Sequence, residues 1–363
     1  MTYSVHTIEL SCTISLHEYN ALKEKLHLLA PSIETHEPYK SKDKKLLIYE
    51  TIYRKLHIAG INCIKLKKIT VKKTSAILSI HLYITVNLAN ILSQKTCVTT
   101  DIITPDKIDS AVNQLQYTLQ NLVKNEIADR IALNRVDFCC DLKMPSQKMA
   151  EEYLQLLRRG NPSKTLKEKK MLDQSQHRYI PYKDSFLLQC KSYEFQIYLK
   201  YNQMKNTCYS QNIDYALGLL RFELRAKKTK IQQLSKKYNH KSRPVGFREF
   251  LNSAPLIAQT EIPAIIAKMV GTSNFCTYQA AKEKIEEADL KYKTRKRMFY
   301  ILDYYAKHTK YQNLLKDLGL SRKEWNHLLK KFNMIHTNPI TISRTYQRQE
   351  YPGIYYWDTL AEL

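Results

Sequence analysis

Three segments in the middle of the chain alternate apolar and polar residues with a period of two, as a β-strand does when it buries one face. They span residues 135–142, 195–201 and 219–226. The apolar faces carry Val136, Phe138, Cys140 and Leu142, then Phe195, Ile197, Leu199 and Tyr201, then Leu220, Phe222, Leu224 and Ala226. The opposite faces carry Arg135, Asp137, Cys139 and Asp141, then Gln196, Tyr198 and Lys200, then Arg221, Glu223 and Arg225. In one antiparallel sheet, these polar faces would form a continuous surface.

The rest of the chain predicts an α+β fold: an antiparallel-sheet domain of two related halves, followed by a helical region. Expected strands are 8–16, 44–58, 65–73, 76–92 (the central one), 135–144, 185–190, 193–204 and 219–228. Expected helices are 17–29, 105–129 and 147–159, with helical patterns from 229 onward and two helices in 277–309. The predicted domains are 1–130, 131–250 and 251–363.

Residues 311–335 predict a helix-turn-helix, with the turn at Gly319 and a helix N-cap at Ser321. The segment TNPITISRTYQRQ (337–349) is expected to add a β-wing, which would complete a winged helix. A helical hairpin with a glycine turn is also common in purely structural settings.

The charge of the chain indicates a polyanionic partner. Lys and Arg number 58 against 34 Asp and Glu, a formal net charge of +24. A membrane surface is the other way to use such a charge, but there is no apolar stretch of about 18 residues and no basic amphipathic anchor at the start of the chain. With no signal-peptide pattern at the N-terminus, we expect a cytoplasmic protein whose eight cysteines are reduced.

Several enzyme classes are disfavoured by what the sequence lacks. None of the seven glycines forms a GxGxxG or GK[ST] phosphate loop, which argues against ATP hydrolysis by that route. No two of the 11 histidines are spaced for HExxH chemistry or for a His-hydrophobic-His metal pair. A metal ion in this protein would therefore depend mainly on carboxylates.

The predicted polar surface combines groups that suit phosphodiester chemistry. Carboxylates can hold Mg²⁺ or Mn²⁺, which polarise a phosphodiester. Arginine matches phosphate oxygens, and a tyrosine hydroxyl near a cation becomes a better nucleophile. The structural alternative is the solvated face of a half-exposed sheet, in which Asp137 and Glu223 pair with neighbouring arginines.

The segments NRVDFCCDL (134–142), FQIYLKYNQM (195–204) and LLRFELRAKK (219–228) resemble the phage and plasmid rolling-circle replication initiation proteins. That family carries an R-x-D strand, a strand ending in Tyr-x-Lys, and an R-x-E-x-R/K strand, in this order. The resemblance covers roughly residues 130–230. It implies an enzyme that nicks one strand at an origin, keeps a 5′-phosphotyrosine link and later rejoins the DNA.

By position, the resemblance implies that Tyr198 is the nucleophile and that Lys200 and Arg221 contact phosphate. Asp137 and Glu223, with Asp141, would hold Mg²⁺ or Mn²⁺. Tyr201 stands as a second candidate nucleophile. A further candidate is the run Tyr300, Tyr304 and Tyr305, in which the first two lie one helical turn apart, although packing explains this run better.

The expected partners are origin DNA, both duplex and single-stranded, a host helicase and polymerase, and a second copy of the chain. No membrane contact is expected. The residues expected to bind duplex DNA are Arg295, Lys296, Arg297, Arg322, Lys323, Lys330 and Lys331. Two rival hypotheses need no catalysis: an origin-binding initiator or transcriptional regulator that uses its winged helix, and an RNA-binding protein that stacks bases on tyrosines.

Overall fold

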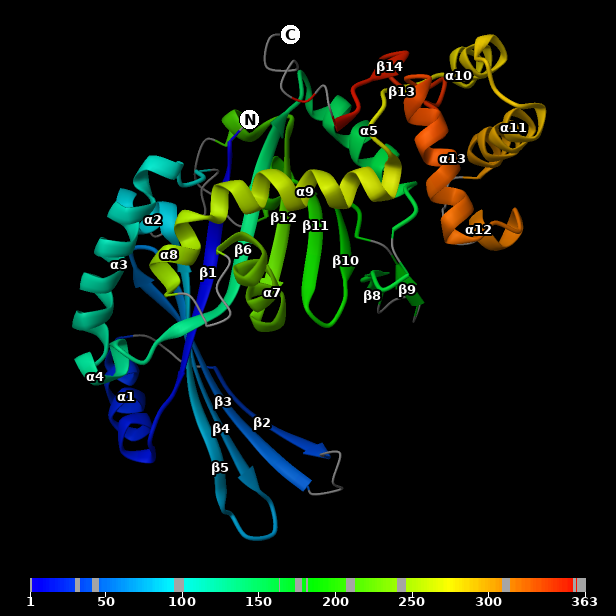
Figure 1. Ribbon diagram of the computed structural model, residues 1–363. Helices are drawn as coiled ribbons and strands as arrows, with labels where there is room; N and C mark the ends of the chain where they lie inside the picture. The colour runs from blue at the N-terminus through cyan, green and yellow to red at the C-terminus, as the bar shows by residue number, and fades with distance from the viewer. Residues whose placement is uncertain are drawn as a thin grey trace. The chain divides into compact units, whose positions relative to one another are not determined.

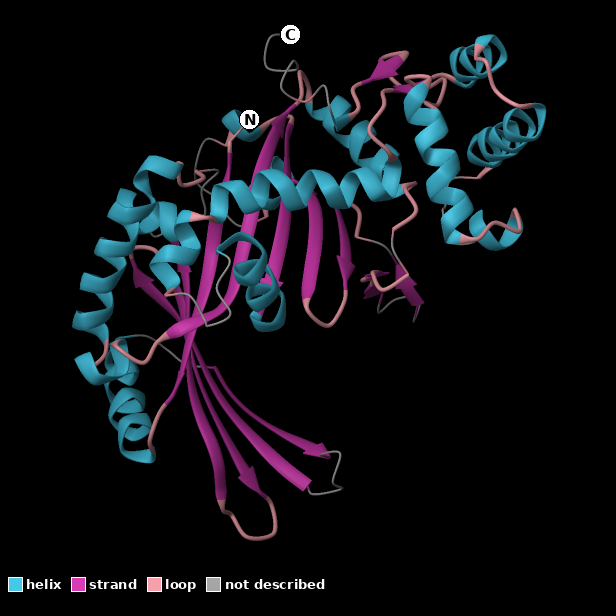
Figure 2. Cartoon of the chain, viewed as in Figure 1, coloured by secondary structure: helices cyan, strands magenta, loops and turns pink. Residues whose placement is uncertain are grey.

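The computed structural model describes residues 2–29, 33–40, 46–94, 101–162, 164–173, 178–180, 182–206, 213–239, 246–308, 314–354 and 357. The fold is α+β, as the sequence predicts (Figures 1 and 2). Within these residues, no helix combines the length and the hydrophobicity that a membrane crossing requires. The described cysteines are all free thiols, as expected, whereas Cys97 and Cys208 lie outside the described residues.

A ten-stranded sheet organises the chain, with the strand order β2-β3-β4-β5-β1-β6-β12-β11-β10-β7. The pairs β2–β3, β3–β4, β4–β5, β1–β5, β10–β11 and β7–β10 are antiparallel. The strands are β1 (Tyr3–Thr13), β2 (Ile33–Lys40), β3 (Leu46–Ile58), β4 (Ile61–Val71), β5 (Ile77–Asn87), β6 (Ala132–Lys143), β7 (Lys167–Glu168), β10 (Ser185–Gln189), β11 (Tyr193–Leu199) and β12 (Leu219–Lys227). Two short pairs lie outside it: β8 (Met171–Asp173) with β9 (Arg178–Ile180), and β13 (Phe275–Cys276) with β14 (Glu350–Tyr351).

The chain divides into two compact units, each built from separate stretches of sequence. Unit 1 comprises residues 1–2, 139–224 and 258–363, and unit 2 comprises residues 3–138 and 225–257. The predicted division at residues 130 and 250 stays a prediction about domains.

In unit 2, the hairpin β4–β5 pairs with β1 through β5 and with the hairpin β2–β3 through β4, and helices α1–α4 lie beside these strands (Figure 1). The helices are α1 (Leu16–Leu29), α2 (Leu88–Ser93), α3 (Ile108–Leu122), α4 (Asn125–Ala128), α7 (Lys228–Asn239) and α8 (Phe247–Asn252). Alternate residues of the strands are buried, among them Leu10 of β1, Leu66 of β4 and Leu82 of β5. The predicted strand 76–92 ends early, because Asn87 caps α2 by accepting a hydrogen bond from the backbone of Asn90.

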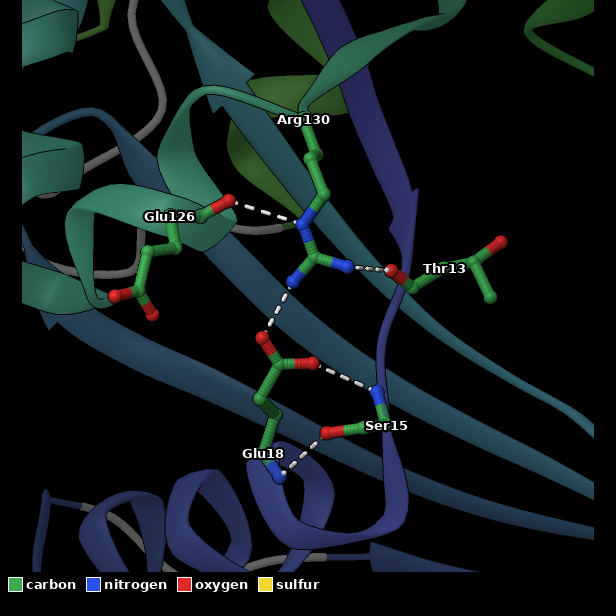
Figure 3. Close-up of polar contacts among 5 residues, drawn as sticks. All are labelled: Thr13, Ser15, Glu18, Glu126 and Arg130. Atoms are coloured by element: carbon green, nitrogen blue, oxygen red, sulfur yellow. Dashed lines mark hydrogen bonds and ion pairs between the residues drawn. The ribbon is translucent and has the colours of Figure 1, made fainter.

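One arginine fastens the end of β1 to the start of α1 (Figure 3). Arg130 donates hydrogen bonds to the carbonyl oxygens of Thr13 and Glu126, each over 2.9 Å, and forms an ion pair with Glu18. Glu18 and Ser15 also bond reciprocally through backbone and side chain, which is a capping box. The guanidinium therefore joins residues 13–18 to residues 126–130, two segments that are distant in sequence.

In unit 1, helix α5 (Gln147–Arg158) is the element on which the end of the chain packs. Its Tyr153 is buried, accepts a hydrogen bond from the indole of Trp357 and donates one to the carbonyl of Pro352. The carboxylate of Glu152 accepts hydrogen bonds from the backbone of Gln347 and from the hydroxyl of Tyr351. The other helices of this unit are α6 (Lys200–Lys205), α10 (Tyr278–Glu287), α11 (Tyr292–Lys307), α12 (Leu314–Asp317) and α13 (Arg322–Met334), and α9 (Ala254–Val270) begins in unit 2.

The predicted helix-turn-helix is confirmed as a local structure. Gly319 has a φ of +59° between α12 and α13, and Ser321 caps α13 in a capping box with Glu324. The predicted β-wing is wrong, because residues 337–349 form only a single bridge, between Ile342 and Thr277. The chain beyond this segment instead pairs as β14 with β13, so it extends unit 1 and does not form a hairpin beside α13.

Candidate active site

The hydroxyl of Tyr198 is held by a carboxylate of the neighbouring strand. Tyr198 is the penultimate residue of β11, and its Oη donates a hydrogen bond of 2.7 Å to Oε1 of Glu223 in β12. Both residues are buried, with exposed fractions of 6% and 5%. The alternation correctly places the two side chains on the same face of the sheet, but that face is buried and not solvated.

Arg221 lies two residues before Glu223 and points to the same face. It is fully buried, and its Nε and Nη2 each lie 2.7 Å from an oxygen of the Asp141 carboxylate. This fork-to-fork pairing holds the guanidinium in one orientation. Arg221 therefore supplies a fixed positive charge near Tyr198. Asp141 occupies one edge of its guanidinium.

Lys200 is a second buried cation, close to Arg221, Glu223 and Asp141. It is the first residue of α6, not a strand residue as predicted, and it has no exposed surface. Within the described residues, its Nζ has no hydrogen-bond partner. Burial, and after it the nearby charge of Arg221, lower the pKa of Lys200 to about 7. This ammonium group can therefore gain or lose its proton near neutral pH.

The resting state of Tyr198 is the neutral phenol. Burial raises its pKa well above the ordinary value, and the charge of Glu223 raises it too, whereas Arg221 opposes this. A neutral phenol that donates to a carboxylate is poised to pass its proton to that carboxylate when the oxygen forms a new bond. The five side chains Tyr198, Glu223, Arg221, Asp141 and Lys200 are hereafter the tyrosine cluster, and all belong to unit 1.

Asp137 is not part of the tyrosine cluster. It belongs to unit 2, where its two carboxylate oxygens lie 3.0 Å from Nε of Arg135 and 3.4 Å from Nε of Arg225. Pairing with neighbouring arginines is the alternative to metal binding that the sequence leaves open for Asp137. Its carboxylate is buried and balanced by two cations.

The three predicted metal ligands fit a shared cation poorly. The carboxylate of Asp137 binds arginines, that of Asp141 binds Arg221, and that of Glu223 accepts from Tyr198. Among the described residues, no three His, Cys, Asp or Glu side chains gather as a metal site would require. A requirement for Mg²⁺ or Mn²⁺ thus stays a prediction, and no step below depends on one.

The alternative tyrosines occupy different surroundings. Tyr201 lies in α6, half-buried, and so does not share a strand with Tyr198 as predicted. On α11, Tyr300 is exposed, and Tyr304 donates a hydrogen bond to Asp317 and stacks on His308. Tyr305 is buried against Trp325. Tyr304 and Tyr305 therefore pack α11 against its neighbours, which is the role that the sequence favours for this run of tyrosines.

The seven basic residues expected to bind duplex DNA differ in availability. Arg322 donates to Asn161 and Pro162, Arg297 pairs with Glu324 at 3.0 Å, and Arg295 donates to the carbonyl of Ala288. Lys331 lies 3.7 Å from the sulfur of Met334. The exposed members of the set are Lys296, Lys323 and Lys330. The arginines thus have structural roles within unit 1, and the exposed lysines remain as candidates for phosphate contacts.

Sequence reasoning missed a second polar face, on β4 and β5 of unit 2. Its signal is the alternation within 76–92, where His81 and Tyr83 stand between buried Ile80, Leu82 and Ile84. The β-branched composition of that segment predicts a central strand but assigns no role to its half-exposed residues.

No family model matches the chain, and no curated protein matches it in sequence. Among solved structures, a rolling-circle replication initiator protein from Geobacillus stearothermophilus aligns over 94% of this chain and 98% of its own, at 10% identity and a TM-score of 0.28. The di-domain ARO/CYC StfQ of the steffimycin biosynthetic pathway aligns over 71% of this chain and 96% of its own, at 10% identity and a TM-score of 0.22. Likenesses this weak leave the function to be argued from the residues themselves.

Proposed function

We propose that this chain cleaves and rejoins a DNA strand, with Tyr198 as the nucleophile, in the manner of a replication initiator. The observation that carries the proposal is the 2.7 Å hydrogen bond from the Tyr198 hydroxyl to Glu223, beside the buried cations Arg221 and Lys200. The net charge of +24 supports a nucleic acid as the substrate.

In the proposed reaction, Oη of Tyr198 attacks the phosphorus and its proton passes to Glu223. The bond from phosphorus to the 3′-oxygen breaks, and Lys200 in its ammonium form supplies the proton that this oxygen takes up. The products are a 5′-phosphotyrosine and a free 3′-hydroxyl, and rejoining is the reverse. Arg221, held by Asp141, stabilises the negative charge that builds on the phosphoryl oxygens.

The burial of the cluster favours a second candidate, in which it is only a polar network inside unit 1. Arg221 and Lys200 are fully covered, and Asp141 already neutralises Arg221. The protein would then bind an origin through its basic surface without cutting it. The two candidates differ in one observable, a covalent bond between protein and DNA.

The test uses the full-length protein and a supercoiled plasmid that carries the DNA flanking its gene, with and without Mg²⁺ or Mn²⁺. We expect nicked circles and an SDS-resistant protein–DNA adduct from wild type, and neither from Tyr198→Phe. Tyr201→Phe is the matched control, because it removes one hydroxyl from a half-buried position nearby and should retain both products.

Two further outcomes decide between the candidates. An adduct that persists in Tyr198→Phe and disappears in Tyr201→Phe would move the nucleophile to α6. The absence of any adduct in wild type, together with sequence-selective binding of the plasmid, would establish the non-enzymatic initiator. Glu223→Gln should slow cleavage and leave DNA binding intact, because it removes the proton acceptor but little volume.

A further inference from the structure

The charged side chains of the hairpin β4–β5 are all basic. Residues 61–87 contain five lysines and no Asp or Glu. Two of these, Lys72 and Lys73, are exposed in the turn, and Lys65 and Lys67 are half-exposed on one face of β4. A hairpin of this composition attracts anions wherever its side chains reach solvent.

The register brings two aromatic rings beside the β4 lysines. Lys65 is opposite Tyr83, which is in turn opposite Ser11 of β1, and the next row on the same face is Lys67, His81 and Thr13. The ammonium of Lys65 lies 5.3 Å from the centroid of the Tyr83 ring.

The rings of His81 and Tyr83 are 6.2 Å apart and are themselves half-exposed. We name Lys65, Lys67, His81 and Tyr83 the strand patch.

The opposite face of the same strands is core. Lys68 belongs to that face, where it pairs with Glu50 at 2.7 Å and lies over the ring of Tyr19 in α1. Ile64, Leu66 and Leu82 are buried there. The strand patch is thus the side of the hairpin that α1 does not cover.

The charges around the strand patch are predominantly positive. Burial lowers the pKa of His81, and the charges of Lys67 and Lys228 lower it further, so the imidazole is a neutral ring at neutral pH. Burial raises the pKa of Tyr83, and the negative charge of Glu9 raises it further. Glu9 accepts a hydrogen bond from Asn134 and lies 3.9 Å from Arg135, so its charge is partly balanced.

We propose that the strand patch binds single-stranded DNA, with the lysines on phosphates and the rings of Tyr83 and His81 against bases. Basic side chains interleaved with aromatic rings on a strand face suit this ligand, because every base offers a flat face for stacking. Duplex DNA lacks such faces, since its bases are paired and stacked on one another. The assignment does not depend on Tyr198 and goes beyond the cleavage reaction.

The test is fluorescence anisotropy of a labelled dT oligonucleotide of about 20 nucleotides, long enough to cover one such surface, with the full-length protein. Lys65→Gln/Lys67→Gln should weaken binding at low salt and reduce the slope of log K against log salt by about 1.4, since each phosphate contact on a single strand contributes about 0.7. Tyr83→Leu should weaken binding about 5-fold to 150-fold, the loss expected for one stacked base. Tyr83→Phe, which keeps the ring, should bind like wild type.

Lys107→Gln/Lys124→Gln is the matched control, because it removes two exposed charges from the N-termini of α3 and α4 in the same unit. If the strand-patch pair binds dT no more weakly than this control pair, the proposal is wrong. Equal losses on dT and on a duplex of the same length would also overturn it, as would a clear preference for oligo-U.

Thermal unfolding of each variant checks that it is folded. If Tyr83→Leu is destabilised, the binding of Lys65→Gln/Lys67→Gln alone tests the proposal. Tyr198→Phe should bind dT normally. Failure of the cleavage proposal and failure of this one are therefore distinguishable.

Discussion

The hydroxyl of Tyr198 and the carboxylate of Glu223 form a buried hydrogen bond of 2.7 Å between adjacent strands. Removing the hydroxyl leaves the carboxylate without this donor in a place that water reaches poorly. We therefore expect Tyr198→Phe to lower the free energy of unfolding by about 1–3 kcal/mol, contrary to the small effect that a solvated face predicts. Urea denaturation measures this change, and Tyr201→Phe, at a half-buried position, should change stability less.

Lys200 predicts an unusual dependence of stability on pH. Its pKa is about 7 in the folded protein against 10.5 for an ordinary lysine, so between these values the unfolded chain binds a proton that the folded chain has released. Stability should therefore rise with pH across this window, and below about pH 7 this contribution should be constant at its least favourable value.

Lys200→Met removes the buried charge, so it should be more stable than wild type at pH 6 and should lose the rise between pH 7 and 10. Urea midpoints of the two proteins at several pH values test this. Parallel profiles for wild type and variant would show that Lys200 keeps an ordinary pKa.

The exposed lysines of α11 and α13 should contribute to duplex binding. Lys296→Gln/Lys323→Gln/Lys330→Gln should weaken the affinity for origin duplex and leave cleavage of a single-stranded oligonucleotide unchanged. Deleting residues 277–363 is not a usable test, because Trp325 and Trp357 belong to the buried core of unit 1. Gel-shift titration of the triple variant checks the prediction, and undiminished affinity would remove these helices from the interface.

Glu18 should make the corner between β1 and α1 sensitive to acid. Burial alone would raise its pKa, but the hydrogen bonds from Ser15 and the charge of Arg130 lower it overall from the ordinary 4.5. A depressed carboxyl pKa contributes stability above the unfolded value that is lost as pH falls through the folded one.

Glu18→Gln should accordingly be less stable than wild type at pH 7, and the difference should shrink as the pH falls below about 4.5. Glu24→Gln, an exposed change in the same helix, is the control and should show no such convergence. Thermal melts at pH 3–7 measure both.

The charge excess should make DNA affinity steeply dependent on salt. Each neutralised phosphate of a duplex releases counterions, so log K should fall linearly with log salt at about 0.9 per contact. Binding titrations between low and moderate salt measure the slope. A flat response would exclude phosphate contacts as the source of affinity and with them the nucleic-acid hypothesis.

The sequence predicted local structure well wherever a local signal exists. Alternation placed Tyr198, Arg221 and Glu223 on one face, and Gly319 with Ser321 located the turn and the start of α13. Alternation does not say what covers a face, because the covering residues come from distant parts of the chain. The burial of Arg221 was therefore not predictable from β12 alone.

Two other predictions were wrong because the local pattern is too short to decide the structure. The pattern of 193–204 continues through Lys200, yet the backbone turns into α6 there, a choice that apolar spacing over so few residues cannot decide. The expected wing failed because the edge that β14 joins is β13, some 75 residues away in the sequence. Long-range pairing of two-residue strands leaves almost no local signature.

The attachment of Trp357 and Tyr351 to α5 has a consequence for biosynthesis. Unit 2 is complete once residue 257 has been made, whereas unit 1 needs both residues 139–224 and the end of the chain. Because the ribosome shields the most recently added residues, the face of α5 that these side chains cover stays open until residue 357 has emerged from the ribosome. The order of maturation thus follows from chain connectivity: unit 2 can fold before residues 258–357 have been made, and unit 1 only after residue 357 has emerged.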